Sequence, residues 1–384
     1  MKKALMVASV ASMIDQFNMG NIAILEQLGY RVEVAANFDQ GSNTSPQRVA
    51  EFKQELTAAG RVYHQVDIPR SIFKVGSILR SLKQLKTLCN EEQYQLIHCH
   101  SPIGGVVARL AARKSRKKGT KVIYTAHGFH FYKGASLKNW LLFYPMERLC
   151  ARITDLLITI NQEDYDLAKR KMKAAEVVYV PGIGVNTAAF SGEETDLKAL
   201  REELGLNPED KVVLSVGELS KRKNHKVVLE AIAKVPIPTV HYLICGIGPE
   251  EENLLNRART LGFEKRLHLL GFRRDIPKLL ALADVYAFPS LQEGLPVALM
   301  EAMAAGKAVV CSGIRGNRDL IEPSFGGEVL ATDDAEGFAH AIGRLLSIPS
   351  IAEKMGSYNR RRIRDFDRAV VDEQMKTLYE KISQ

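Results

Sequence analysis

Two glutamates eight residues apart mark the part of this sequence whose residue types and spacing are best suited to chemistry. Glu293 and Glu301 lie in the segment SLQEGLPVALMEAMAAG, which runs from residue 290 to residue 306. The mostly apolar run 283–289 before it predicts a buried strand, and the stretch 297–305 is rich in helix formers. Glu293 is therefore expected over the carboxyl end of a strand, and Glu301 on the helix that follows.

A strand-to-helix junction of this kind favours binding of a phosphorylated ligand. In open α/β sheets ligands bind at the carboxyl ends of the strands, and the free amides at the start of a helix attract phosphate. Gly294 is expected in the turn and Pro296 at the first helical position. One carboxylate above a sugar and a second near a ribose would bracket a nucleoside diphosphate. The alternative for two glutamates at this spacing is a solvated helical face.

A cluster of cations follows an earlier predicted strand, 212–216. The sequence GELSKRKNH begins at Gly217 and contains Lys221, Arg222 and Lys223. A leaving nucleoside diphosphate develops negative charge as its bond to the sugar breaks, and fixed cations there lower the barrier without a metal ion. The alternative is a basic helix start on the protein surface.

Histidines mark the ends of two predicted strands in the first half of the chain. His127 follows the run 121–126 and is expected to donate to a sugar hydroxyl or to help move the proton of an acceptor. A buried structural histidine is the alternative. His98 and His100 share one face of a strand, but zinc ordinarily needs at least three protein ligands and no third one lies at a convincing spacing. We therefore expect no metal site and assign His100 to the wall of a cleft.

The turn after the first predicted strand, 4–8, is a candidate for contact with a second substrate. Ser12 and Asp15 follow that strand. Asp15 is expected either to contact an acceptor hydroxyl or to cap the helix that follows.

Length and charge indicate two domains with different surfaces. A chain of 384 residues suits two domains of roughly 150 to 200 residues each. Residues 1–186 carry 26 Lys and Arg against 15 Asp and Glu, and the remainder carries 27 against 29, so the net charge of +9 comes from the first part. Much of the excess forms a basic cluster near the end of a predicted helix, Arg109, Arg113, Lys114, Arg116, Lys117, Lys118 and Lys121. Such a cluster favours a membrane surface, a diphosphate-linked lipid or nucleic acid, and a solvated helix end is the alternative.

Cysteine usage and the absence of long apolar runs predict a cytoplasmic location. The five cysteines are scattered and lack the spacing of a metal or redox pair. The start, MKKALMVA, is expected to open a strand rather than a signal peptide, and no run of about 18 apolar residues predicts a membrane span.

Short apolar runs alternate with amphipathic stretches along the whole chain, as in βαβ units with parallel sheets. The expected strands are 4–8, 31–35, 62–66, 95–99, 121–126, 155–160 and 177–180, followed by 212–216, 241–245, 267–270, 284–288 and 308–311. A segment rich in glycine and small residues, 181–194, is assigned as the linker between the two series. The prediction is two Rossmann-like α/β domains facing a cleft, 1–185 and 186–360, and a helical segment 361–384.

The segment FPSLQEGLPVALMEAMAAGKAVV, from Phe288, resembles the donor-site signature of glycosyltransferase family 4, whose members are retaining enzymes with the GT-B fold. Three more blocks agree with this family: TAHG around His127, VGEL with Lys223 after it, and LGFR at 270–273. The opening block and INQEDY at 160–165 resemble members that serve bacterial capsule or exopolysaccharide assembly.

The resemblance implies transfer of a hexose or N-acetylhexosamine from a nucleotide sugar, above all a UDP-sugar, with retention at the anomeric carbon and with no metal or other cofactor. The acceptor is a free saccharide or one carried on polyprenyl diphosphate. The implied catalytic residues are His127, Glu293 and Lys223. The implied donor-binding residues are Glu301, Lys223, Gly217, Phe272, Arg273, Gly294, Leu295 and Pro296, and the acceptor side is assigned to Asp15, Ser12 and His100. By the same analogy the segment 361–384 packs back on the first domain.

One position departs from the family pattern. Glu218 stands where many members carry an arginine that helps bind the diphosphate. Lys221 and Arg222 are the two alternatives for this second cation.

Two other functions stay open on the sequence alone. A UDP-sugar 2-epimerase of similar fold would need no acceptor, and a membrane or nucleic-acid binding module would have a degenerate cleft. The net charge of −2 after residue 186 and the full set of donor-site residues argue against a pure binder, so no nucleic-acid partner is expected. The basic first domain is expected to contact the anionic inner face of the cell membrane peripherally.

Overall fold

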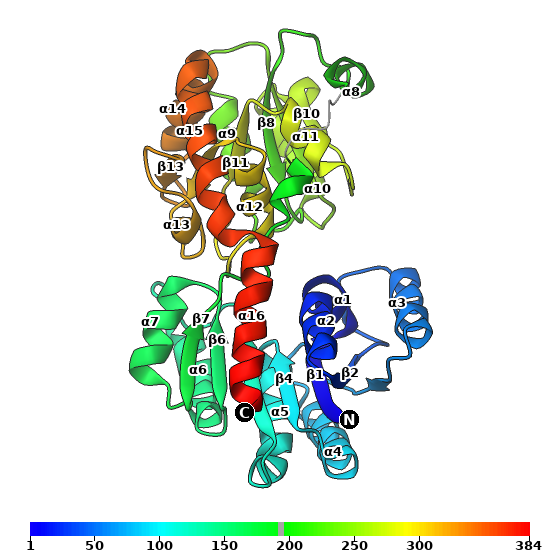
Figure 1. The fold of residues 1–384 in the computed structure, drawn as a ribbon. Coiled ribbons are helices and arrows are strands. Elements are labelled where there is room, and N and C mark those ends of the chain that lie inside the picture. The colour runs from blue at the N-terminus through cyan, green and yellow to red at the C-terminus, as the bar shows by residue number, and fades with distance from the viewer. Residues whose placement is uncertain (191–195) are drawn as a thin grey trace. The chain divides into compact units, whose positions relative to one another are not determined.

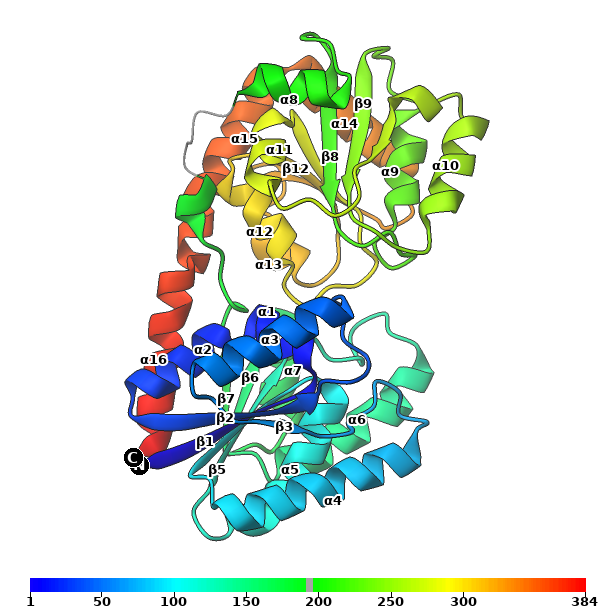
Figure 2. The same ribbon diagram turned by 90° about the vertical axis from the view of Figure 1, so that its right-hand side faces the viewer.

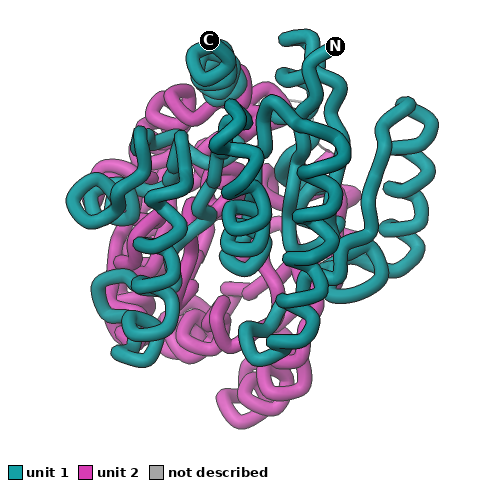
Figure 3. The backbone as a smooth tube through the Cα atoms, turned by 90° about the horizontal axis from the view of Figure 1, so that it is seen from below, with its two compact units in different colours: residues 1–183, 371–384 teal, residues 184–370 magenta. Residues whose placement is uncertain are grey.

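The chain forms two compact units, each built on its own parallel sheet. The computed structural model describes residues 1–190 and 196–384. The first unit contains residues 1–183 and 371–384, and the second contains residues 184–370 (Figure 3). The division falls within the expected linker 181–194, of which residues 191–194 lie outside the described part.

A seven-stranded sheet forms the centre of the first unit (Figure 1). Its strands are β1 (Lys2–Val10), β2 (Tyr30–Asn37), β3 (Tyr63–Gln65), β4 (Leu96–His100), β5 (Lys121–Ala126), β6 (Leu156–Thr159) and β7 (Glu176–Tyr179). Their order across the sheet is β3-β2-β1-β4-β5-β6-β7, and all pairs are parallel. Residues 4–10 are buried without alternation, as a sheet covered on both faces requires.

Helices cover both faces of this sheet (Figure 2). They are α1 (Ala11–Phe17), α2 (Met19–Gln27), α3 (Pro46–Ala58), α4 (Val75–Glu92), α5 (Pro102–Arg116), α6 (Leu137–Ala151) and α7 (Gln162–Lys171), together with the C-terminal α16 (Arg368–Ser383). Helices α1, α2, α3 and α16 share one core with the sheet, and α4 to α7 share the other. Neighbouring residues of β1 point into different cores, Met6 into the first and Leu5 and Val7 into the second.

The second unit has a six-stranded parallel sheet of order β10-β9-β8-β11-β12-β13. The strands are β8 (Lys211–Val216), β9 (Val240–Cys245), β10 (Leu267–Leu269), β11 (Val285–Phe288), β12 (Ala308–Ser312) and β13 (Gly327–Leu330). Its α-helices are α8 (Leu197–Leu204), α9 (His225–Ile232), α10 (Glu251–Thr260), α11 (Ile276–Leu282), α12 (Val297–Ala304), α13 (Asn317–Leu320), α14 (Ala335–Ser347) and α15 (Pro349–Arg362). Three short 3₁₀ helices in the described part of this unit, labelled η, are η1 (Thr187–Phe190), η2 (Glu264–Arg266) and η3 (Ile363–Phe366). Helices α9, α10 and α14 pack in one core with this sheet.

Each sheet reverses its strand order at one point. In the first unit β1 pairs with both β2 and β4, and in the second β8 pairs with both β9 and β11. After one of the two central strands the chain continues toward one edge of the sheet, and after the other it continues toward the opposite edge. The segments that follow the two central strands therefore diverge. The crevice between such loops is where open α/β sheets bind ligands.

The C-terminal helix α16 connects the second unit back to the first. Residues 361–370 of the predicted returning segment belong to the second unit, and the return starts at Val371. Val371, Met375 and Tyr379 are buried in the core formed with α1, α2 and α3. Four residues apart, they form one apolar stripe on the helix.

Candidate active site

An ion pair joins the two loops at the switch point of the second unit. Nζ of Lys223, in the loop after β8, donates to Oε1 of Glu293, in the loop after β11, at 2.7 Å. The two side chains are only 13% and 12% exposed, and Nζ lies 4.8 Å from the centre of the Phe288 ring. The structure thus brings together the two residues predicted to act on the diphosphate and the sugar.

A second cation shares the same carboxylate oxygen. Nη1 of Arg222 lies 2.9 Å from Oε1 of Glu293 and also donates to the backbone carbonyl of Gln292. Lys221, the other candidate, is exposed, and so is the Arg222 side chain, at 44%. Arg222 is thus the candidate that contacts Glu293, and its role as the second cation stays a prediction.

Hydrogen bonds to backbone carbonyls hold the loop after β8 against the loops after β11 and β13. Asn224 has a left-handed backbone, with φ of 56°, and its Nδ2 donates to the carbonyls of Pro289 at 3.2 Å and Thr332 at 2.8 Å. The amide of Leu291 donates to the carbonyl of Arg222 at 2.8 Å. The two cations are therefore held on a fixed frame, which reduces the reorganisation needed during a reaction.

Two glycines allow close packing beside the Lys223 side chain. A Cβ atom on Gly217 would lie 3.1 Å from Cε of Lys223, and one on Gly246 would lie 1.9 Å from the carbonyl oxygen of Gly217. Gly217, predicted to bind the donor, has no side chain and therefore leaves room for the side chain of Lys223.

Helix α12 starts one residue later than the sequence predicts. Pro296 is its N-cap residue, with φ of −80° and ψ of 117°, because the proline backbone is extended there and Val297 is the first helical residue. The cap position supplies no side-chain hydrogen bond, and the amide of Leu299 donates to the carbonyl of Pro296, so the amides of Val297 and Ala298 are the ones left for an anion. Gly294 and the buried Leu295 lead into this turn, and a Cβ on Gly316 would lie 2.2 Å from the carbonyl oxygen of Gly294.

Arg315 is a residue of this site that the sequence analysis did not single out. It is buried, and its Nε donates to the backbone carbonyl of Glu293 at 3.2 Å. It belongs to the loop directly after β12, the strand next to β11. Its place just after a predicted strand, 308–311, is the sequence signal that could have identified it.

Glu301 lies in α12 and is partly buried. Burial raises the pKa of its carboxyl group to about 7, and Arg368 at the start of α16 offsets part of that shift. The group is therefore divided between its neutral and charged forms near pH 7, and hydrogen bonds from a ligand to its oxygens would favour the charged form.

Phe272 and Arg273 lie in the loop after β10. The Phe272 ring is 73% exposed and is not part of the core. The guanidinium of Arg273 binds both carboxylate oxygens of Asp275, at 2.8 and 2.6 Å, and Oε1 of Glu203 at 2.6 Å. The arginine side chain therefore fixes the loop, and the exposed ring and the backbone are the parts left for the predicted contact with a base.

In the first unit, His127 directly follows β5 and lies beside His100 at the end of β4. Nδ1 of His100 lies 3.1 Å from Nε2 of His127. Burial lowers the pKa of His127 to about 4 and the pKa of His100 well below its usual value. Both rings are therefore neutral at pH 7. In the described part of the chain no three His, Cys, Asp or Glu side chains come together as a metal site would require.

Ser12 and Asp15 lie in helix α1, where the sequence predicted a turn, and both bind residues of the segment that follows β2. The carboxylate of Asp15 binds Arg48 of α3, at 2.6 and 2.9 Å, and Oγ of Ser12 accepts from the amide of Asn43 at 3.1 Å. Asn18, not Asp15, occupies the cap position of α2, so the capping prediction for Asp15 is wrong because α1 continues past it to Phe17. The acceptor contact assigned to Asp15 stays a prediction.

A cavity of about 580 Å³ opens at the switch point of the first unit. The carboxyl ends of β1 and β4, the first residues of α5, the segment 70–73 and the start of α6 form its walls, and Arg70, Lys138, Phe73, Leu142 and Phe143 line it. It combines two cations with an apolar surface. Ser12, Asp15 and His100 do not line it.

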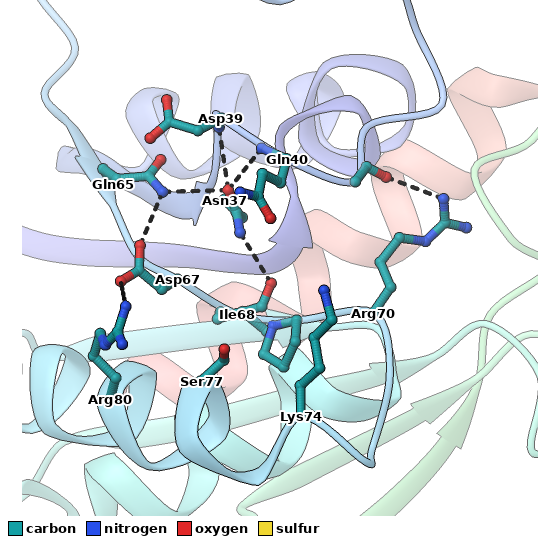
Figure 4. Close-up of a pocket in the computed structure, with 12 residues that line it drawn as sticks. Asn37, Asp39, Gln40, Gln65, Asp67, Ile68, Arg70, Lys74, Ser77 and Arg80 are labelled. Carbon is teal, nitrogen blue, oxygen red and sulfur yellow. Dashed lines mark hydrogen bonds and ion pairs between the residues drawn. The ribbon is translucent and has the colours of Figure 1, made fainter.

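A smaller polar hollow of about 360 Å³ lies at the ends of β2 and β3 (Figure 4). Its polar groups largely bind one another, since Nε2 of Gln65 donates to Oδ1 of both Asn37 and Asp67. Lys74 projects into it from the start of α4 (Figure 4). Arg70 lines both hollows, and its Nη1 donates to the carbonyl of Gly41.

The basic cluster predicted from the sequence is not one surface patch. Arg109 is fully buried, with Nη2 2.7 Å from Oε2 of Glu147 and the guanidinium 3.9 Å from the centre of the Tyr124 ring. Arg116 binds Asp155 at 2.7 Å. The other members lie at the end of α5 and before or at the start of β5, at the amino ends of the strands. The cavity lies at the opposite, carboxyl ends.

Helix α6 has an exposed apolar side, which we call the α6 face. Its large apolar residues are between 42% and 76% exposed and are Leu137, Leu141, Leu142, Met146 and Leu149. Its cations, Lys138, Arg148 and Arg152, are exposed, whereas the acidic Glu147 is buried. Phe73, which shares the cavity with Leu142, is 76% exposed. No helix in the described part is long and apolar enough to cross a membrane.

Comparison with known proteins decides the family. Residues 196–362 match the family described as Glycosyl transferases group 1, and residues 43–161 match Glycosyl transferase 4-like. The putative glycosyltransferase EpsD of Bacillus subtilis is 36% identical over 382 residues, which are 98% of this chain and 96% of EpsD. This chain belongs to the group 1 glycosyltransferases.

A second relative of this glycosyltransferase is the UDP-Gal:alpha-D-GlcNAc-diphosphoundecaprenol alpha-1,3-galactosyltransferase of Escherichia coli, 32% identical over 275 residues, 70% of each chain. The crystal structure of Anabaena HepE with UDP-glucose superposes with a TM-score of 0.79 at 21% identity, covering 99% of this chain and 100% of HepE. The glycosyltransferase WaaG gives 0.72 at 16% identity, covering 98% and 99%. The predicted GT-B fold of two Rossmann-like domains and the predicted hexosyltransferase class are thereby confirmed.

Proposed function

We propose that this glycosyltransferase moves a hexose or N-acetylhexosamine from a UDP-sugar to a saccharide carried on polyprenyl diphosphate, in capsule or exopolysaccharide synthesis. The observation that carries the donor half is the pair of cations, Lys223 and Arg222, on the carboxylate of Glu293 at a switch point. The substrates named for the Escherichia coli relative and the UDP-glucose bound to HepE support the choice of donor and acceptor.

The two cations exchange partners when the donor binds. In the structure both rest on Oε1 of Glu293, and a diphosphate with two negative charges is the stronger partner. Once Lys223 and Arg222 bind the diphosphate, Glu293 is free to contact the sugar hydroxyls and to stabilise positive charge at the anomeric carbon. The cations then neutralise the charge that develops on the leaving group, so the mechanism needs no metal ion.

The departing phosphate oxygen accepts the proton of the acceptor hydroxyl. The acceptor oxygen attacks the anomeric carbon from the same face that the diphosphate leaves, so the configuration is retained. The amides at the start of α12 hold the diphosphate, Glu301 binds the ribose, and Phe272 meets the base. His127 of the first unit contacts the transferred sugar.

The cavity of the first unit suits an amphiphilic acceptor. Arg70 and Lys138 supply charge for a diphosphate, and Phe73, Leu142 and Phe143 supply an apolar wall for the first isoprene units. Leu142 and Lys138 also belong to the α6 face, where apolar residues and cations occur without an exposed acid. We therefore assign the contact with an anionic membrane to the α6 face, and not to the basic cluster at the end of α5.

A product screen tests this proposal. UDP- and GDP-sugars are incubated with a polyprenyl-diphosphate saccharide, with and without EDTA, and products are analysed by mass spectrometry and by NMR of the new anomeric centre. We expect transfer from a UDP-sugar, in EDTA as well, with retention. Glu293→Gln should lower turnover by about 10²- to 10³-fold, and the exposed control Glu322→Gln should not. An epimer formed without acceptor, or full turnover by Glu293→Gln, would contradict the proposal.

A further inference from the structure

A short chain of contacts connects Met6 to the candidate sugar-binding histidine. Nε2 of His100 lies 3.2 Å from Sδ of Met6 on β1, and Nδ1 of His100 lies 3.1 Å from Nε2 of His127. Met6 and His100 are buried. Each ring nitrogen of His100 therefore has one defined neighbour.

The chemistry of these neighbours fixes where the protons lie. A thioether sulfur can only accept a hydrogen bond, so the nitrogen facing Met6 must carry the hydrogen. A neutral imidazole has one N–H, so Nδ1 of His100 is bare and can only accept. The bond to Nδ1 must then be donated by Nε2 of His127, which leaves Nδ1 of His127 without a hydrogen.

We propose that Met6, acting through His100, holds His127 in the tautomer with hydrogen on Nε2, so that Nδ1 of His127 accepts a hydrogen bond from a substrate hydroxyl. Met6 and His100 are positioning residues in this account. The part that concerns substrate rests on the proposed function, because it takes His127 to be the group that contacts the transferred sugar.

A second layer of contacts keeps the His100 ring in place. The His98 ring lies 4.2 Å from the His100 ring, centre to centre. Nδ1 of His98 is 2.7 Å from the hydroxyl of Tyr379 on α16, and Nε2 is 2.8 Å from Oγ1 of Thr125. Both hydroxyls can donate or accept, so they fix the orientation of His98 without dictating its tautomer. The preference of His100 for one tautomer therefore comes from its contact with Met6.

The consequence is a choice between two roles for His127. A histidine with a bare Nδ1 accepts from a hydroxyl, whereas the other tautomer would donate to it. A sugar hydroxyl replaced by fluorine can no longer donate but remains a weak acceptor, so the acceptor role of His127 predicts a larger loss of affinity than the donor role does.

The tautomer is measured directly by NMR of protein labelled with ¹⁵N in the histidine rings, with the His127 signals assigned by comparison with His127→Gln. We expect the pattern of a protonated Nε2 and a bare Nδ1 in the wild-type protein. Met6→Leu keeps the apolar volume but removes the acceptor, and should shift His127 toward a mixture of tautomers. Met355→Leu, the same change in the core of the second unit, should leave the pattern unchanged. A bare Nε2 in the wild type, or no change in Met6→Leu, would overturn the assignment.

Binding of UDP-sugars with single fluorine replacements tests the contact with substrate. We expect one replaced position to weaken binding by about tenfold in the wild type, and this loss to vanish in His127→Ala. UDP itself, which lacks the sugar, should bind both proteins equally. If the wild-type protein does not bind UDP, the proposed donor site is refuted. If UDP binds but His127→Ala does not change the effect of fluorine at any sugar position, only the acceptor role of His127 is refuted.

Discussion

Nζ of Lys223 lies 2.7 Å from Oε1 of Glu293, across the switch point between β8 and β11. The two residues are 70 positions apart in the chain, and the parallel sheet brings them together because both follow the carboxyl ends of adjacent strands. With Arg222 on the same oxygen, a carboxylate occupies the position that our proposal gives to the donor diphosphate.

The identity of the second cation can be tested with matched substitutions. Arg222→Met removes the guanidinium beside Glu293, whereas Lys221→Met removes an exposed cation one residue away. We expect the first to weaken UDP binding by about tenfold, roughly 1.4 kcal/mol, and the second to have little effect, both by calorimetric titration. The reverse order would assign the role to Lys221.

Donor binding should depend on pH through Glu301. The folded-state pKa of about 7 lies above the usual 4.5, so the carboxyl is largely protonated at pH 6 and charged at pH 8. Ribose hydroxyls donate to the charged form, so UDP-sugar affinity should rise as pH increases from 6 to 8, by at most about tenfold per unit. A UDP-sugar is the right probe because its diphosphate has no terminal phosphate to titrate near pH 7. Glu301→Gln should abolish the slope; an unchanged slope in this variant would exclude Glu301 as its source.

The α6 face can be tested by placing charge on it. Leu141→Glu combined with Leu149→Glu puts two carboxylates among its exposed leucines. We expect this variant to bind phosphatidylglycerol vesicles at least tenfold more weakly in co-sedimentation, since burying one leucine is worth about 1.5–3 kcal/mol. Leu197→Glu, on an exposed leucine of α8, is the control. Undiminished vesicle binding by the double variant would remove the α6 face from the account.

The buried pair of Arg109 and Glu147 should be important for the stability of the first unit. Glu147→Gln leaves a buried guanidinium without its counter-charge, and we expect the free energy of unfolding to fall by about 3–5 kcal/mol. The single tryptophan, Trp140 on α6, reports unfolding of this unit in a denaturant titration. Glu176→Gln, which breaks the exposed pair with Lys381, should cost at most about 1 kcal/mol. Equal effects of the two changes would show that the buried pair is not needed.

The sheets and the ends of their strands were predictable from the sequence for a physical reason. Strands covered on both faces must be almost continuously apolar, and the residues after them must leave the core. The twelve predicted strands were confirmed, and with them the positions of His127, Lys223 and Glu293. β13 was missed because only Val329 and Leu330 of its four residues are apolar and it lies at the edge of its sheet.

Side-chain partners were not predictable, because they depend on how distant helices pack. Arg109 looked like part of a surface cluster, yet its partner Glu147 is 38 residues away on another helix. Asp15 looked free to bind a ligand, yet Arg48 of α3 occupies both of its oxygens. Which of Lys221 and Arg222 contacts Glu293 depends on how the loops after β8 and β11 pack together, which nothing in the charge pattern indicates.

The central claim, that the donor diphosphate is bound where Lys223 meets Glu293, is tested most directly by titrating UDP into wild-type protein and Lys223→Met in the presence of EDTA. We predict that UDP binds the wild type and that the substitution weakens binding at least tenfold, roughly 1.4 kcal/mol. Lys226→Met, on the exposed side of α9, should retain wild-type affinity. Equal affinity of Lys223→Met and the wild type would contradict the claim.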